Sequence, residues 1–380
     1  MTDLRREQCA KALRCLRWVP TYAWQRLTRG LPSRQPVHLM FAIANHFEPE
    51  FMPGAPGRYA DLDERERRVD KWCRGDRALS DRWRDVDGLP LRHTYFYPAE
   101  HYDKRLIDRL AAHCRGGWGE IEVHLHHGIS VPDTAENTRR ALLHFRDALA
   151  GHGCLSYLDD EGPPRYAFVH GNWALANSAG GRYCGVDDEM QILADTGCYA
   201  DMTLPSAPDA TQTAKINALY ECKPPLNKRA PHREGHDLRA GRVPTRFPLI
   251  VQGPLGMNFD GFTARGFPQI ENGELTAVNP PTMHRLTLWR KAGIRVNGRP
   301  DWLFVKLHCH GMIPQDTEAL LGQPMQRFLS ELLEAGAGGR YQTHFVTARE
   351  MINIILAACD GRDGNPGQYR DYRLRTRPTG

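Results

Sequence analysis

At 380 residues the chain is longer than one small domain, yet a single α/β barrel with insertions fits this length. Hydrophobic residues make up 41% and charged residues 25%, which excludes a disordered chain. The ten cysteines contain no CxxC pair, and no leader-like or membrane-length apolar run occurs. We therefore expect a globular, reduced protein of the cytoplasm that does not span a bilayer.

The formal net charge of +5 is concentrated in residues 1–36, where eight Arg or Lys face two acidic residues. Apolar side chains recur there at helical spacing and are joined by Trp18, Tyr22 and Trp24. This pattern predicts a basic amphipathic arm. The arm either packs across the bottom of the main domain or associates with an anionic membrane through residues 1–30, and both interpretations stay open.

Residues 37–358 are predicted to form one domain in which strands and helices alternate. Amphipathic stretches separate the apolar runs, and one of them, residues 133–151, starts with Asp133 and Glu136 in capping-box spacing. Residues 210–300, rich in Pro and Gly, are expected to be an insertion with one or two strands, and residues 359–380 a C-terminal tail. Alternation without internal repeats predicts an α/β fold with a parallel sheet or barrel. The expected strands include "VHLMFAIANH", "LRHTYFYPAEHY", "EIEVHLHHG", "PRYAFVHGNW" and "DWLFVKLHCHG".

The strand "EIEVHLHHG" carries three histidines. Because side chains alternate along a strand, His124 and His126 share one face with Glu120 and Glu122, and His127 lies on the other face. At the carboxyl end of a barrel strand, His124 and His126 would be neutral imidazole ligands for zinc or another first-row cation. The alternative is that hydrogen bonds satisfy these histidines and that they bind nothing.

Three other strands also run into polar residues at the same end, which is hard to explain by packing alone. We therefore predict that these strand ends form one metal or acid/base site. Lys306 would hold a developing anion, or it would pair with Glu120 or Glu122 inside the sheet. The sequence has no Walker loop, GxGxxG or GxSxG motif, and no basic aromatic repeat, so no nucleic-acid partner is expected. The residues at these three strand ends are His46, Glu48 and Glu50, then His170, Asn172 and Trp173, then Lys306, His308 and His310.

In this order the motifs resemble the polysaccharide deacetylase (NodB homology) superfamily, over about residues 37–355. The stretch "FAIANHFEP" resembles the first-strand motif with its aspartate base and acidic metal ligand. "EIEVHLHHG" resembles the motif that supplies two imidazole ligands, and "VKLHCHG" the motif whose histidine is the general acid. "FVHGNWAL" stands at the Arg-Pro motif, and "LADTGCYADMTLPS" is similar to the step that follows it. The resemblance implies a distorted (β/α)7 barrel, similar to a TIM barrel, with a long insertion and an N-terminal basic helix.

The sequence departs from the family pattern at three places. His46 stands where the base aspartate belongs, and Glu48 is the nearest carboxylate. The family spaces its histidines four apart, whereas Gly128 is four past His124, so His126 or His127 must supply the second ligand. A histidine also replaces the arginine of the third motif.

The resemblance implies a metal-dependent hydrolase that deacetylates an N- or O-acetylated sugar in the biosynthesis of a surface polysaccharide. Its cofactor would be zinc, with cobalt, nickel or manganese as substitutes. A cytoplasmic form attached to a membrane surface would suit a lipid-linked or nucleotide-linked substrate. The implied roles are metal ligation by Glu48, His124 and His126, base catalysis by His46 or Glu50, acid catalysis by His308 beside Lys306 and His310, and sugar contact by His170, Asn172, Trp173, Tyr199 and Asp201.

Two other classes of function remain open. The chain would be another metal-dependent amide hydrolase, or a glycosidase in which Glu48 forms a carboxylate pair with Asp195 or Asp201. Alternatively, it would be a catalytically inactive sugar-binding or scaffold protein, which the missing aspartates would permit.

Overall fold

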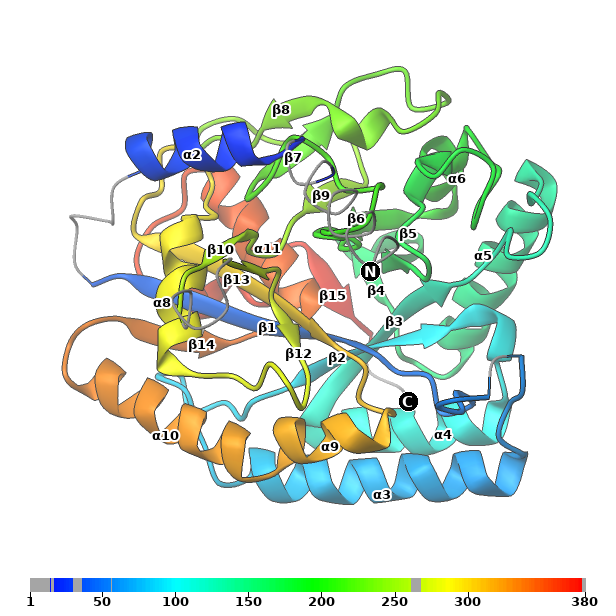
Figure 1. Cartoon of the computed structure of the whole chain (residues 1–380), viewed down its shortest axis with the longest axis horizontal. Coiled ribbons are helices and arrows are strands. Elements are labelled where there is room, and N and C mark those ends of the chain that lie inside the picture. Colours follow the sequence, from blue (N-terminus) through cyan, green and yellow to red (C-terminus); the bar gives the residue numbers. More distant parts are fainter. Residues whose placement is uncertain (1–13, 15–16, 30–35, 56, 261–267, 378–380) are drawn as a thin grey trace, which may run out of the picture.

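A curled, mainly parallel sheet forms the centre of the molecule (Figure 1). The computed structural model describes residues 14, 17–29, 36–55, 57–260 and 268–377. The parallel strands are, in sheet order, β13 (Trp302–Cys309), β1 (His38–His46), β2 (His93–Pro98), β3 (Gly119–Leu125), β5 (Glu161–His170), β6 (Cys198–Asp201) and β9 (Leu249–Val251).

Shorter strands extend this sheet. At one edge β12 (Glu274–Leu275) runs parallel to β13, and β14 (Gln342–Phe345) pairs with the first half of β1. Beyond β9 lie the antiparallel strands β7 (Leu219–Cys222) and β8 (Gly235–Asp237). The strands β4 (Ser156–Leu158) and β15 (Leu374–Thr376) pair beside β5, and β10 (Gly256–Asn258) pairs with β11 (Gln269–Glu271).

Helices cover both faces of the sheet. On the concave face lies α11 (Ala348–Cys359), whose residues are all buried, against the β1 side chains Met40, Ala42 and Ala44. The β1 side chains of opposite parity pack on the convex side in a second cluster. Burial on both faces explains why the strand sequences are continuous apolar runs. The convex-side cluster includes residues of α3 (Leu62–Ser80), α4 (Lys104–His113), α5 (Ala135–Gly151), α6 (Glu189–Thr196), α8 (Met283–Ala292), α9 (Pro314–Leu321) and α10 (Gln323–Ala337).

Local capping determines where two of the predicted helices begin and end. The N-cap of α5 is Thr134, whose side chain accepts from the Asn137 backbone N–H, so the capping box predicted at Asp133 is wrong. Further along, α9 and α10 are separated only by Gly322, which has an extended backbone. Short helical turns complete the chain: η1 (Ala99–His101), η2 (Cys114–Trp118), η3 (Leu175–Asn177), η4 (Pro231–Arg233) and η5 (Pro366–Tyr369).

Residues 210–300 are built into the main sheet, so the expectation of an insertion with one or two strands needs correction. This segment supplies β9 and β12 as well as the strands β7, β8, β10 and β11. Just after β9, a Cβ added to Gly253 would lie 2.5 Å from the carbonyl oxygen of Lys306 in β13. The sheet therefore curls until its far end touches β13, although no ladder between β9 and β13 forms within the described ranges.

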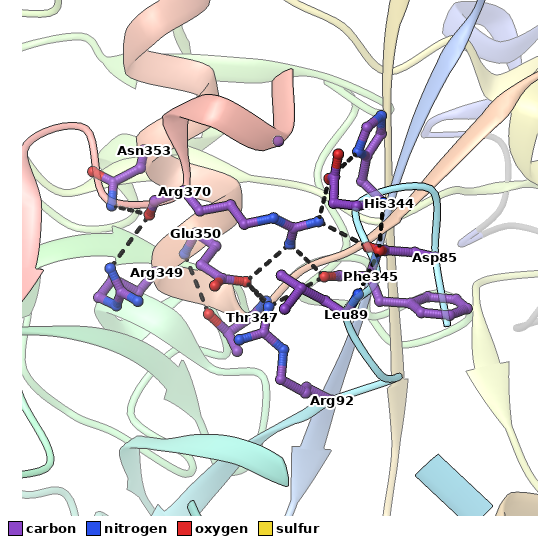
Figure 2. Close-up of polar contacts among 12 residues, drawn as sticks. Asp85, Leu89, Arg92, His344, Phe345, Thr347, Arg349, Glu350, Asn353 and Arg370 are labelled. Atoms are coloured by element: carbon purple, nitrogen blue, oxygen red, sulfur yellow. Dashed lines mark hydrogen bonds and ion pairs between the residues drawn. The ribbon is translucent and has the colours of Figure 1, made fainter. Parts of the chain in front are cut away.

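The C-terminal segment is fixed to the main domain and is not a separate tail. Figure 2 shows Arg370 between the carboxylates of Asp85 and Glu350. Its guanidinium also donates to the Phe345 carbonyl at 2.5 Å and to Asp87 at 2.9 Å. A buried cation thus already occupies the acidic group formed by Asp85 and Asp87, which gives this group a structural role.

The arm packs on the protein through α2 (Val19–Thr28). Trp18, 0% exposed, contacts a cluster that includes Ala207, in the loop that follows β6 at the carboxyl ends of the strands. The part of the arm that the structure describes therefore packs at this end of the sheet and not across the bottom of the domain. Trp24 and Leu27 are 66% and 84% exposed and point away from this contact. Residues 1–13, part of the predicted arm, lie outside the described ranges. In the described part of the chain, no helix has the length and apolar character needed to cross a bilayer.

Candidate metal and substrate site

Four of the predicted strand-end residues converge at the carboxyl ends of β1 and β3. Ligand atoms of His46, Glu48 and His124 lie within 4.8 Å of one another, and all three residues are buried. Oε1 of Glu48 is 3.2 Å from Nε2 of His124 and 3.5 Å from Nε2 of His126. One carboxylate oxygen therefore faces the two histidines that strand alternation assigned to the same side.

The second ring nitrogen of each histidine is held by an acceptor. Nδ1 of His124 lies 2.9 Å from the carbonyl oxygen of Val169, and Nδ1 of His126 lies 2.6 Å from Oε1 of Glu100. A carbonyl or carboxylate can only accept, so each Nδ1 carries the proton. The Nε2 lone pairs are left facing Glu48, which is the arrangement of metal-binding histidines in proteins.

Glu100 belongs to the site as well, although the strand pattern did not predict it. Its side chain receives both the ring N–H and the backbone N–H of His126. The signal was present, because "PAEH" follows an expected strand directly and carries a carboxylate at the same end as the other polar residues. Strand-end position alone therefore identified part of the site.

The charges of these groups suit a divalent cation. Burial raises the pKa of Glu48, but the hydrogen bond with His124 and the nearby His310 outweigh it and lower that pKa to about 2. Burial and the neighbouring histidines hold the pKa of His46 well below its usual value, and burial also lowers the pKa of His124. Burial lowers the pKa of His126, but the bond to Glu100 and the charge of Glu48 outweigh it and raise that pKa, so a cation would have to displace a proton from Nε2 of His126. An ionised carboxylate with imidazoles in their neutral form is a ligand set for zinc and related cations.

His46 lies at the centre of the histidines rather than at their edge. Its ring centroid is 4.9 Å from that of His124, 4.7 Å from that of His310 and 6.1 Å from that of His308. Its buried Nδ1 has no hydrogen-bond partner among the residues described. An orphaned imidazole nitrogen beside Glu48 and His124 fits a metal in this position, so His46 is a ligand candidate as well as a base candidate.

Glu50 is poorly suited to the predicted role of a base. Burial raises its pKa to about 8, so the carboxyl group is protonated at neutral pH. Its Oε1 is 3.9 Å from Nε2 of His101, and burial lowers the pKa of His101. Glu50 in this state can donate a proton but cannot readily accept one.

Lys306 does not form the predicted pair with Glu120 or Glu122. Its Nζ donates at 2.6 Å to the carbonyl oxygens of Met202 and Leu204, and burial lowers its pKa to about 7. Glu120 instead pairs with Arg349 at 2.7 Å, and Glu122 accepts from the Tyr199 hydroxyl. Lys306 therefore links β13 to the end of β6 across the concave face.

A pocket opens beside His308 at the mouth of the sheet. Trp173 lines it together with Pro205, Asn272 and Glu274. Trp173 adopts a left-handed backbone with φ of 57°, a conformation that non-glycine residues rarely adopt without a local reason. Trp173, predicted to contact the sugar, lines the same pocket as the acid candidate His308.

Three residues predicted at the sugar lie elsewhere. Tyr199 is 1% exposed and donates to Glu122 inside the concave face. Asp201 is fully buried and accepts from the Thr203 hydroxyl at 2.7 Å, and burial raises its pKa to about 7. His170 points to the convex side toward His127, and the Asn172 backbone N–H donates to it at 3.3 Å. Position near a strand end in the sequence therefore did not predict on which face of the sheet each of these side chains lies.

The glycosidase pair that includes Asp195 is not formed. Asp195 lies on α6, where its carboxylate accepts from Arg139 at 2.7 Å and is 40% exposed. This surface ion pair directs Asp195 away from the buried Glu48.

Comparison with known proteins gives no family assignment. No protein-family model matches the sequence, and no curated protein matches it either. Among solved structures, an alpha-mannosidase from Enterococcus faecalis V583 is similar at 10% sequence identity with a TM-score of 0.35. The similarity covers 84% of this chain but only 29% of the mannosidase chain. A TM-score at this level does not establish a shared fold, so the site has to be interpreted from its own geometry.

Proposed function

We propose that this chain is a metal-dependent hydrolase that removes an N- or O-acetyl group from a sugar, in the biosynthesis of a surface glycan. The proposal takes the fold as a distorted (β/α)7 barrel of the NodB type. Its main support is the single carboxylate oxygen of Glu48 that faces Nε2 of both His124 and His126, with each Nδ1 held by an acceptor. Three protein ligands with space for substrate are typical of catalytic sites.

Zinc, or cobalt, nickel or manganese in its place, would supply Lewis-acid polarisation of the acyl carbonyl and activation of water. The chain supplies the other functions. His46 is neutral and has a free Nδ1, so it can take up a proton beside Glu48. His308 borders the pocket, and burial with Lys306 holds its pKa well below the usual value. In this proposal it receives the water proton by way of the neighbouring His46 and passes it to the leaving amine or alcohol. Trp173 provides an aromatic wall for the sugar ring.

Acetate release from N-acetylated and O-acetylated sugar donors tests this proposal. We expect the wild-type chain to hold a metal ion in the Glu48 site and to release acetate, and we expect His124→Ala to lose this ion and acetate release. His308→Ala should retain the metal and lose acetate release, because His308 is not among the predicted ligands. His236→Ala, at an exposed position in β8, is the matched control and should retain both properties.

The two alternative classes of function are outcomes of the same experiment. A metal-loaded chain that releases no acetate but cleaves other amide substrates would indicate a different amide hydrolase. A chain that binds no zinc, cobalt, nickel or manganese, with or without His124→Ala, would contradict the hydrolase proposal and favour a sugar-binding or scaffold protein.

A further inference from the structure

A second cluster of metal-ligating side chains lies on the convex side of the sheet. It consists of His127 after β3, His170 at the end of β5, Cys184 in the following loop and Glu189 at the start of α6. Ligand atoms of all four residues lie within 4.8 Å of one another. The four residues are 7%, 0%, 0% and 0% exposed, so the cluster is closed to solvent.

The distances within the cluster approach those of a four-coordinate ion. Nε2 of His127 is 2.8 Å from Oε1 of Glu189 and 3.1 Å from Nε2 of His170. Nε2 of His170 is 3.7 Å from Oε1 of Glu189, and Sγ of Cys184 is 3.6 Å from Oε2 of Glu189. Ligand atoms around tetrahedral zinc are about 3.3–3.6 Å apart, given its usual bond lengths. Small shifts would therefore place all four atoms around one ion.

Without a metal, these contacts require charged groups in a closed space. Asp133 lies 2.9 Å from Nδ1 of His127 and can only accept, so that nitrogen carries a proton. His170 accepts the Asn172 N–H on Nδ1, which leaves its own proton on Nε2. Nε2 of His127 can then donate to Glu189 at 2.8 Å only if His127 is charged, and the N–H of His170 lies 3.1 Å from it. The cluster is therefore either a buried ion pair of His127 with Asp133 and Glu189 or a site for a cation.

A cation offers the second arrangement, because both Nε2 atoms and the carboxylate then contribute lone pairs to one centre. His170 would carry its proton on Nδ1, and the long contact with Asn172 would be lost. The carboxylate of Asp133 would orient His127, as carboxylates commonly do for metal-binding histidines. His127 would then be neutral, with its one proton on Nδ1 and the lone pair of Nε2 directed at the ion.

The loop that carries Cys184 is positioned closely by glycine. Gly128 has φ of 62°, and a Cβ there would lie 2.2 Å from the Cys184 carbonyl oxygen. The same carbonyl accepts from the Asp133 backbone N–H at 2.7 Å. These contacts hold the thiol against the histidines, so its position does not depend on a flexible side chain alone.

We propose that His127, His170, Cys184 and Glu189 form a second, structural metal site of zinc type. Four protein ligands in a closed pocket are typical of structural zinc, whereas the Glu48 site has three ligands beside a pocket. The second site joins the ends of β3 and β5 to α6. It also supports the first site, because His126 precedes His127 and a Cβ on Gly171 would lie 2.2 Å from the His126 ring. The inference does not depend on the proposed deacetylation.

X-ray absorption at the zinc edge of the wild-type full-length chain tests the proposal without a variant. The Glu48 site contains no thiol, so a sulfur ligand to zinc would identify the second site. We expect two zinc ions per chain and, on average, one sulfur ligand for every two ions. Zinc without any sulfur ligand, or a chain without zinc, would overturn the proposal and leave this cluster as a buried ion-pair network.

Cobalt exchange assigns the sulfur to Cys184. A cobalt-loaded chain should show thiolate-to-cobalt charge-transfer absorption, which Cys184→Ser should abolish while one ion per chain is lost. Cys198→Ser, at another buried free thiol, is the matched control and should retain the absorption. Glu48→Gln should retain it too, which separates the two sites. Absorption that survives Cys184→Ser would contradict the proposal, even if acetate release is observed.

Discussion

His124 and His126 are oriented by groups outside the predicted ligand set, namely the Val169 carbonyl and the Glu100 carboxylate. Each acceptor fixes the proton on Nδ1 and so fixes which nitrogen can bind a cation. At the residue scale, the site is therefore defined by these partners as much as by the ligands. Lys306, although it is on the same strand as His308, has two of its three N–H groups bound to backbone carbonyls.

Glu100→Ala tests the role of the partner carboxylate. Without it the His126 ring loses its orientation and its preferred tautomer, so we expect the affinity for zinc to fall about 10- to 100-fold. Competition with a chromophoric chelator measures the change. Glu136→Ala, at an exposed position in the first turn of α5, should leave the affinity unchanged. An unchanged affinity in Glu100→Ala would mean that this contact does not tune the metal site.

At the scale of elements, α11 and the segment after it form the part of the molecule that fills the concave face. α11 is buried along its whole length, and Arg370 joins the following segment to Asp85 and Glu350 (Figure 2). In contrast to α11, the helix α2 lies on the surface of the protein. It packs through Trp18, whereas Trp24 and Leu27 are exposed. Each element yields a separate prediction.

Arg370→Met should destabilise the fold by about 3–5 kcal/mol, because it leaves the buried carboxylate of Asp85 without its cation. Urea unfolding followed by circular dichroism measures this free energy. Arg375→Met is the control, since Arg375 pairs with Asp160 at 2.7 Å and both side chains are 50% exposed. The control should cost about 0–1 kcal/mol. If both substitutions change the free energy of unfolding equally, burial of the ion pair between Arg370 and Asp85 does not contribute to stability.

Replacement of Trp24 and Leu27 by Glu tests association with a membrane surface. These side chains are 66% and 84% exposed, so the double variant should remain as stable as the wild type. We expect it to sediment less with anionic phospholipid vesicles, because apolar anchoring is lost and negative charge is added. Val278→Glu, at an apolar residue that is 85% exposed, is the control and should bind as the wild type does. If the double variant binds equally well, the arm has no such role.

At the scale of the whole molecule, the sheet curls far enough to bring strand ends from distant parts of the chain to one mouth. The far end reaches β13 where Gly253 approaches the Lys306 carbonyl, and Lys306 reaches back to the end of β6. This contact substitutes for the missing ladder between β9 and β13. It also places the pocket of Trp173 and His308 beside the converging histidines.

Gly253→Ala tests this approach. The added Cβ would lie 2.5 Å from a backbone oxygen, so the strands must separate, and we expect a loss of about 1–3 kcal/mol in the free energy of unfolding. Gly151→Ala, at the end of α5 with no atom within 4 Å of the added Cβ, should be neutral or slightly stabilising. A Gly253→Ala variant as stable as the wild type would show that the two strands do not touch here.

The sequence by itself determined the elements and the parity of their side chains. Apolar runs and helical periodicity are local properties, so they located β1, β3, β13 and the helices between them. Strand alternation correctly separated His124 and His126 from His127 for the same reason. Helix ends were less well predicted, because Thr134 competed with Asp133 for the cap and Asp133 was needed by His127.

Only the tertiary structure decided which strand ends meet. The contacts that make Glu100, Cys184 and Glu189 candidate site residues come from other elements of the chain. Tyr199, which was predicted to contact the sugar, instead donates to Glu122 on β3. Such pairings depend on how far the sheet curls and where each loop returns. These are non-local consequences of register and packing, which the sequence pattern of a single strand does not contain.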